Sequence, residues 1–188
     1  MSLKGGILRS SGLTVFDVKD LAALLSLPLP SARVAASRLC RRGILRRLRK
    51  DLYILPDKPL DDPQIANRLL SPSYISFESA LNYWGLSTQI PRSMMSASLR
   101  SKKYRIEGTE FLYYRLPPAL FRFGYRRERD FFIASPEKAL LDTAYYASLG
   151  RKGLSDEIPL SKLNRITLKK MLASYPKKTQ ELLRERLK

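Results

Sequence analysis

The spacing of apolar residues changes within residues 31–50, from a helical period before Gly43 to an extended pattern after it. At about 100° per residue, the small and apolar side chains before Gly43 fall on one face of a helix. They are Ala32, Ala35, Ala36 and Leu39. We expect Ser31 to be the N-cap and Gly43 to be the C′ residue. The segment is therefore predicted to be a helix of about eleven residues with one packed face and one exposed face.

The flanking segments extend this helix into a larger motif. Residues 44–55 are predicted to form two short strands around a tight turn at Arg49, Lys50 and Asp51. Upstream, residues 18–27 have helical spacing, with Asp17 as the expected N-cap. Two helices joined by a short connection and followed by a strand hairpin are typical of the winged helix-turn-helix. We therefore predict a winged-helix domain over residues 1–70.

After residue 70 the pattern differs, because a helix is followed by several strands and then by further helices. Residues 76–84 are predicted to be helical, with Gly85 as the terminator. Strand-like segments then follow at residues 93–101, 103–108, 109–116, 120–126 and 130–135. Helices are expected after Ser135, which caps the first of them. We predict an α+β fold, in which residues 71–188 combine a mainly antiparallel sheet of about four or five strands with packed helices.

The charge balance indicates a polyanionic partner. The chain contains 35 Lys or Arg residues against 17 Asp or Glu residues, a net charge of +18. Residues 31–50 alone contain eight of the basic residues and no acidic residue. A basic helix face is most often simply solvated, but eight uncompensated cations in one short segment repel one another and favour a nucleic acid as partner. Duplex DNA is therefore the expected ligand.

Residue types that are common in catalytic and metal sites are scarce. The chain has no histidine and one cysteine, Cys40, which removes the commonest general base and argues against a zinc site. It has no glycine-rich phosphate loop, and no apolar run approaches the roughly 20 residues that a membrane span needs. We therefore expect no catalytic residue, no metal, no cofactor and no membrane contact, and we expect a cytoplasmic location.

Two alternative functions stay open. A carboxylate-dependent nuclease would use Glu78, Glu107, Glu110, Glu137 or Asp142. Their spacing does not favour a metal site, because Glu137 and Asp142 lie five residues apart on a predicted helix and do not share a face. We expect surface or capping roles for these carboxylates. The other alternative is an RNA- or protein-binding module that uses the winged helix for docking.

The exposed face of the helix before Gly43 supplies three candidates for base contacts, namely Arg33, Ser37 and Arg41. Cations nearby are expected to hold phosphates and set the register, and they are Arg38, Arg46, Arg47, Arg49 and Lys50. Ser31, at the start of the helix, completes the predicted DNA-binding set. A second polyanion contact is predicted in residues 71–188, around Lys102, Lys103, Arg126 and Arg127 and the C-terminal lysines.

Two segments after residue 70 carry a resemblance to a known family. They are YISFESALNYWGL at residues 74–86 and IASPEKALLD at residues 133–142, on either side of the strand-rich region. Together with the predicted winged helix, they make the chain similar, over nearly its whole length, to the AbiEi-type antitoxins of bacterial abortive-infection (type IV) toxin-antitoxin systems. The chain departs from that family at the wing turn, where Arg49, Lys50 and Asp51 replace the glycine that is common in relatives.

The resemblance implies a transcriptional repressor that is also an antitoxin in phage defence. Its winged helix would bind inverted repeats at the promoter of its own operon, which implies double-stranded operator DNA as a partner and a homodimer on that DNA. Its C-terminal domain would counteract a nucleotidyltransferase-like toxin. The cognate toxin is then a functional partner, and the resemblance leaves open whether the two proteins bind directly.

Overall fold

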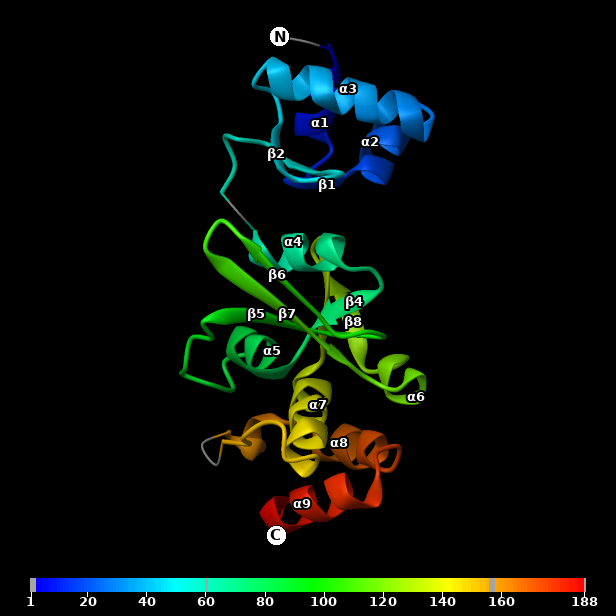
Figure 1. Ribbon diagram of the computed structural model, residues 1–188. Coiled ribbons are helices and arrows are strands. Elements are labelled where there is room, and N and C mark those ends of the chain that lie inside the picture. Colours follow the sequence, from blue (N-terminus) through cyan, green and yellow to red (C-terminus); the bar gives the residue numbers. More distant parts are fainter. Residues whose placement is uncertain (1–2, 60, 156–157, 188) are drawn as a thin grey trace. The chain divides into compact units, whose positions relative to one another are not determined.

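The computed structural model describes residues 3–59, 61–155 and 158–187 (Figure 1). The fold is mixed α+β, and the chain divides into two compact units, Met1–Leu69 and Leu70–Lys188. Among the described residues, no helix is both long enough and apolar enough to cross a membrane.

The first unit combines helices with a small antiparallel sheet. Its elements are α1 (Leu3–Ser10), β1 (Val15–Asp17), α2 (Val18–Leu24), α3 (Leu29–Arg41), β2 (Arg46–Arg49), β3 (Leu52–Ile54) and α4 (Asp62–Leu69). The strands are ordered β1-β3-β2, so that β3 pairs with both neighbours in antiparallel register. Its core consists of the apolar faces of α1, α2 and α3 together with side chains of the sheet, and Leu8, Phe16, Leu21 and Ala36 are completely buried there.

Local sequence signals explain where α2 begins and where α3 ends. The predicted N-cap of α2 is confirmed, because the Asp17 carboxylate accepts hydrogen bonds from the backbone N–H groups of Lys19 and Asp20 at 2.7 and 2.8 Å. The Asp20 carboxylate in turn accepts a hydrogen bond from the backbone N–H of Asp17 at 2.9 Å, which completes a capping box. Gly43 follows the C-cap of α3 with φ +67°, the left-handed conformation that favours glycine.

The predicted start of α3 is wrong. The helix begins at Leu29, with Pro28 as its N-cap, so Ser31 lies within the first turn and caps nothing. The prediction failed because Pro30 was treated as a boundary. A proline in the first helical turn costs no hydrogen bond, since the N–H groups there have no partner within the helix, and its fixed φ suits the helix.

The second unit contains a six-stranded sheet with helices packed on it. Its elements are β4 (Ser73–Ile75), α5 (Phe77–Tyr83), β5 (Ser93–Ser98), β6 (Lys102–Ile106), β7 (Thr109–Arg115), α6 (Pro118–Phe121), β8 (Tyr125–Glu128), β9 (Phe131–Ala134), α7 (Pro136–Ser148), a 3₁₀ turn (Leu160–Lys162), α8 (Arg165–Leu172) and α9 (Lys177–Leu187). The strand order is β6-β7-β5-β4-β9-β8. The sheet is mixed, because β5 runs parallel to β7 and β4 runs parallel to β9, while the other neighbours are antiparallel.

Two predictions about this sheet are corrected. The sheet has six strands instead of four or five, because β4 is a three-residue strand directly before α5 and gives no alternating pattern of useful length. Residues 120–126 do not form one strand. Pro117 and Pro118 start the short helix α6 instead, and β8 begins only at Tyr125.

Candidate nucleic-acid interface

The inner face of α3 is lined by small side chains, as the helical spacing predicted. Ala32, Ala35, Ala36 and Leu39 are all buried. Because three of these four side chains are alanines, the α3 backbone can approach α2 closely, and the two helices pack together in the first unit (Figure 1). This packing fixes which side of α3 remains in solvent.

The outer face of α3 is a stripe of polar and basic side chains. Its exposed residues are Ser31, Arg33, Val34, Ser37, Arg38, Arg41 and Arg42. Positions 34, 38 and 41 follow one another at helical spacing, so they lie on one line along the helix. Within the described part of the chain, Arg38, Arg41 and Arg42 form no ion pair, and their guanidinium groups are available to a ligand. The helical spacing also predicts Val34 on this face, whereas Arg42 was missing from the prediction.

Arg33 is held differently from the other arginines of α3. Its Nε donates to Asp51 Oδ1 at 3.1 Å and its terminal NH2 donates to Asp51 Oδ2 at 3.0 Å, which is a bidentate ion pair. The hydrogen bond from Arg33 lowers the pKa of the Asp51 carboxyl, and the same bond raises the pKa of Arg33. The pair joins the first half of α3 to the turn of the β2–β3 hairpin.

Asp51 also explains how the hairpin turns without a glycine. Its φ is +60°, a left-handed conformation in which Asp is tolerated better than most residues. The hairpin is further shaped by a bulge between Arg47 and Arg49, and Arg47 Nε donates to the carbonyl oxygen of Arg49 at 3.1 Å. Sequence reasoning gave Asp51 no role beyond the turn, although its position at the tip where glycine is common was a usable signal.

The turn supports a stability prediction that separates the ion pair from the backbone. Asp51→Gly removes the carboxylate but keeps the left-handed φ, so we expect a loss of about 0.2–1 kcal/mol, the usual value of an exposed ion pair. Asp51→Ala also strains the turn and should cost about 1 kcal/mol more. Urea unfolding of the two variants measures the difference. Equal stabilities would show that the backbone conformation at residue 51 has no energetic consequence.

The hairpin adds cations to those of α3. Arg46, Arg47 and Lys50 are exposed, and Arg49 is half-buried. Most acidic residues of the first unit are engaged elsewhere: Asp17 caps α2, Asp57 pairs with Arg9, Asp61 accepts from Gln64, and Asp20 pairs with Arg68 at 2.9 Å. Asp51 offsets part of the basic character of α3 and the hairpin through its ion pair with Arg33.

Cys40, at the end of α3, is not a reactive thiol. Its side chain is half-buried beside the core of the first unit. Burial raises the pKa of the thiol, and the nearby charge of Arg47 opposes this only in part. The neutral thiol therefore dominates at neutral pH, and Cys40 acts as a small hydrophobic residue.

The predicted second polyanion contact is not one surface. Lys102 and Lys103 belong to β6 and Arg126 and Arg127 to β8, and these are the opposite edge strands of the six-stranded sheet. Three of the four also have acidic partners, in the pairs Lys103–Glu110 at 2.7 Å, Arg126–Glu128 at 3.3 Å and Arg127–Asp130 at 3.5 Å. The sequence could not reveal this separation, because it arises from the strand order.

The carboxylates considered for a nuclease do not assemble either. Glu78 pairs with Lys152 at 2.7 Å and Glu110 pairs with Lys103. Among the described residues, no group of three or more His, Cys, Asp or Glu residues could hold a metal ion. The predicted surface or capping role is wrong for Asp142, which is completely buried, whereas Glu137 Oε1 does accept the backbone N–H of Asn164 at 2.9 Å.

Asp142 is the centre of a buried polar cluster that sequence reasoning missed. Its carboxylate accepts hydrogen bonds from Lys138 Nζ at 2.5 Å, Ser76 Oγ at 2.7 Å, Tyr175 Oη at 2.7 Å and Tyr74 Oη at 3.1 Å. Lys138 is also completely buried, and its ammonium lies 4.9 Å from the centre of the Phe123 ring. The cluster is closed to solvent, so it is a structural element and offers no substrate site.

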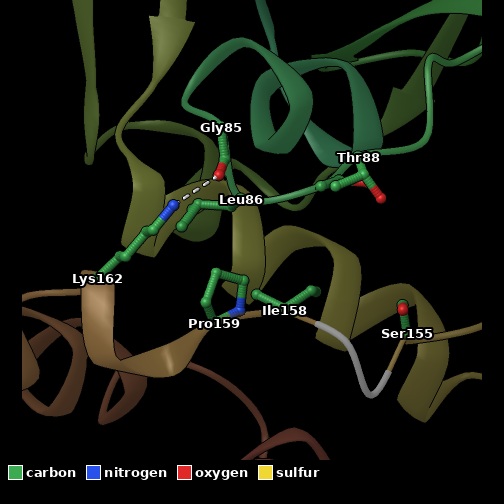
Figure 2. Close-up of a pocket in the computed structure, with 8 residues that line it drawn as sticks. Gly85, Leu86, Thr88, Ser155, Ile158, Pro159 and Lys162 are labelled. Atoms are coloured by element: carbon green, nitrogen blue, oxygen red, sulfur yellow. Dashed lines mark hydrogen bonds between the residues drawn. The ribbon is translucent and has the colours of Figure 1, made fainter.

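The second unit also contains a small open pocket (Figure 2). It has a volume of about 220 Å³ and lies between the end of α5 and the segment before α8; its lining residues are Gly85, Leu86, Ser87, Thr88, Ser155, Ile158, Pro159 and Lys162. Lys162 Nζ points to the carbonyl oxygen of Gly85 at 3.4 Å. The described lining residues contribute hydroxyl groups, from Ser87, Thr88 and Ser155, and the amine of Lys162.

Comparison with known proteins adds no relative to these observations. No protein-family model matches the chain, and no curated protein matches it significantly.

Proposed function

We propose that residues 1–69 form a winged helix-turn-helix that binds duplex DNA, with α3 as the recognition helix and the β2–β3 hairpin as the wing. The order α1-β1-α2-α3-β2-β3 supports this assignment, because α2 and α3 are joined by a short connection and the hairpin directly follows α3. A helix of this kind, about 10–12 Å wide with its side chains, fits the major groove of B-DNA, which is about 12 Å wide.

The observation that carries the proposal is the composition of the solvent face of α3. It presents Arg38, Arg41 and Arg42, which form no ion pair with any residue that the structure describes, and the hairpin adds four more cations. Arg41 and Ser37 are assigned to base edges, because arginine suits bidentate contact with guanine and serine can serve several bases. Arg38 and the hairpin cations are assigned to phosphates.

Arg33 has a conditional role in this proposal. In the free protein it is paired with Asp51, so a base contact by Arg33 requires that pair to open. Because the pair is partly exposed, opening it costs little, and a contact with guanine can offset that cost. We therefore assign Arg33 first to positioning the wing and second to base recognition.

The resemblance to AbiEi-type antitoxins supports a more specific proposal. The protein would be a non-enzymatic repressor that binds inverted repeats at the promoter of its own toxin-antitoxin operon. Residues 70–188 would counteract a nucleotidyltransferase-like toxin. An inverted repeat would be bound by two copies of the chain, whose recognition helices would reach half-sites about 34–36 Å apart, one turn of DNA.

Salt dependence tests the DNA-binding proposal. Five cations are assigned to phosphates, namely Arg38, Arg46, Arg47, Arg49 and Lys50. At about −0.9 per contact, these five cations of residues 1–69 predict a slope of about −4.5 for log K against log [salt], and phosphate contacts elsewhere in the chain would make it steeper. The measurement is fluorescence anisotropy of a labelled duplex over a range of salt concentrations, with a structured RNA as the comparison. A slope near zero on duplex DNA, or clearly tighter binding to the RNA at every salt concentration, would refute the proposal.

A further inference from the structure

The outward side of α8 and α9 is strongly basic. We call it the C-terminal basic face; its exposed members are Arg165, Lys169, Lys170, Lys177, Lys178 and Arg184. Residues 163–184 contain these six cations and a single acidic residue, Glu181. Within the described part of the chain, none of the six forms an ion pair. This is a larger uncompensated charge than that of either edge strand of the sheet.

Helix stability can account for Lys169 and Lys170, which lie in the last turn of α8, but not for the cations at the two helix N-termini. Arg165 occupies the first turn of α8, and Lys177 and Lys178 occupy the first turn of α9. Cations at a helix N-terminus oppose the helix dipole, and neither helix has an acidic residue in its first turn. Arg165 and Lys169 also repel each other at i,i+4 spacing. The cations in the two first turns therefore cost the free protein energy that a bound polyanion would offset.

The inward sides of α8 and α9 are anchored to α7, against which both helices pack (Figure 1). Leu168, Leu172 and Leu183 are buried. Three polar contacts reinforce the packing: Tyr175 Oη in the buried cluster around Asp142, Thr179 Oγ1 to Ser148 Oγ at 2.9 Å, and the backbone N–H of Asn164 to Glu137. The six cations therefore project from a firmly held pair of helices, which lowers the entropy cost of binding.

We propose that the C-terminal basic face is a nucleic-acid contact that binds the phosphodiester backbone through charge, without reading sequence. It lies in residues 70–188 and does not depend on the winged helix assigned to residues 1–69. Four of its six cations are lysines, which are depleted in protein–protein interfaces, and its exposed side carries no aromatic anchor. Among the side chains of α8 and α9 that the structure describes, Ile166 is the one large apolar side chain that is strongly exposed, at 82%, which is too little for insertion into a membrane surface.

The test uses the full-length chain with four lysines of this face neutralised: Lys169→Gln, Lys170→Gln, Lys177→Gln and Lys178→Gln. The matched control neutralises four exposed arginines elsewhere in the same unit: Arg92→Gln, Arg100→Gln, Arg115→Gln and Arg122→Gln. Both variants lose the same charge, and circular dichroism and urea unfolding check that each is folded. Binding to a random-sequence duplex and to a single strand is measured by anisotropy at several salt concentrations.

We expect the basic-face variant to bind at least one of the two nucleic acids roughly tenfold more weakly, with a salt slope shallower by about 3. The control should change affinity by less than about threefold. The nucleic acid for which the affinity falls, duplex or single strand, shows which kind of backbone the face binds. Equal losses in both variants would show that net charge alone is responsible, and unchanged binding would overturn the inference. If the basic-face variant lost binding to anionic lipid vesicles but kept its affinity for both nucleic acids, the inference would also be overturned, in favour of a membrane surface as the partner.

A third variant separates this inference from the proposed function. Arg38→Gln with Arg41→Gln removes cations of α3 only, so it weakens duplex binding if the winged-helix proposal holds. An unchanged affinity in that variant would count against the winged helix and leave the C-terminal basic face untouched. An unchanged affinity in the lysine variant would count against the C-terminal basic face and leave the winged-helix proposal untouched.

Discussion

Replacing Asp142 by alanine is expected to destabilise residues 70–188 by about 3–5 kcal/mol, because it leaves a buried charge without its partner. Lys138 and Asp142 are both completely buried, and the ammonium lies 2.5 Å from the carboxylate. The substitution also removes the acceptor for Tyr74, Ser76 and Tyr175. This is the largest effect on stability that we expect from any single substitution in the second unit.

Fluorescence of Trp84 during urea unfolding is the suitable measurement. It is the single tryptophan of the chain and its Nε1 donates to the carbonyl oxygen of Ala134 at 2.8 Å, so its signal reports on the second unit. Glu181→Ala, which removes an exposed acid, is the control and should change the free energy of unfolding by no more than about 0.5 kcal/mol. If Asp142→Ala unfolded like this control, the buried cluster would have no structural importance.

The dependence on pH provides a second readout for the same variant. Burial lowers the pKa of Lys138, and the Asp142 carboxylate opposes that shift. Without Asp142, the cause that remains is burial, which lowers the pKa of Lys138. Between the lowered pKa of the folded state and the ordinary value of 10.5, the unfolded chain binds the proton more tightly, so stability rises with pH. We therefore expect Asp142→Ala to recover part of its loss as the pH rises from about 7 toward 10.

Arg41→Ala and Lys50→Ala are expected to weaken DNA binding in two different ways. Arg41 is exposed on the outer face of α3 and is assigned to a base edge, so its loss should cost about 1–3 kcal/mol on the preferred sequence and relax the preference at one base pair. Lys50 lies in the hairpin turn and is assigned to a phosphate. Its loss should weaken preferred and random duplexes by similar factors, because a phosphate contact carries no direct sequence information.

The preferred duplex for this comparison is selected from a random library with the unchanged protein. Each variant is then titrated against that duplex and against a scrambled duplex of the same length at one salt concentration. Ser10→Ala is a suitable control, because this exposed residue lies at the end of α1, outside α3 and the hairpin. The same uniform loss for Arg41→Ala and Lys50→Ala would show that the outer face of α3 does not read bases.

Local features of the fold could be predicted from the sequence, and features that depend on distant contacts could not. The alanine face of α3 follows from helical spacing alone, and Asp17 and Gly43 act through backbone groups within three or four residues of themselves. By contrast, the Arg33–Asp51 pair joins residues 18 positions apart. Asp142 meets Tyr74 across 68 positions, and its i,i+4 spacing to Lys138 within α7 does not by itself distinguish a buried pair from an exposed one.

The same limit applies to the two basic surfaces. The charge of residues 31–50 is concentrated in one helix and one hairpin, so counting charges along the chain locates it. The sequence does not show whether Lys102 and Arg126 lie on the same surface, and the strand order places them on opposite edges of the sheet. The sequence already indicated a surplus of lysines near the C-terminus, and the buried leucines of α8 and α9 then showed which sides of these helices remain in solvent.

A titration of the ¹⁵N-labelled full-length protein with the selected duplex, followed by amide chemical shifts, tests the winged-helix proposal most directly. At 21.5 kDa the free chain is small enough for this measurement. We predict that the largest shifts in residues 1–69 fall in α3 and in the β2–β3 hairpin, with smaller shifts in α1 and α4. Binding that leaves the amides of α3 and the hairpin unchanged would contradict the proposal, whatever happens in residues 70–188.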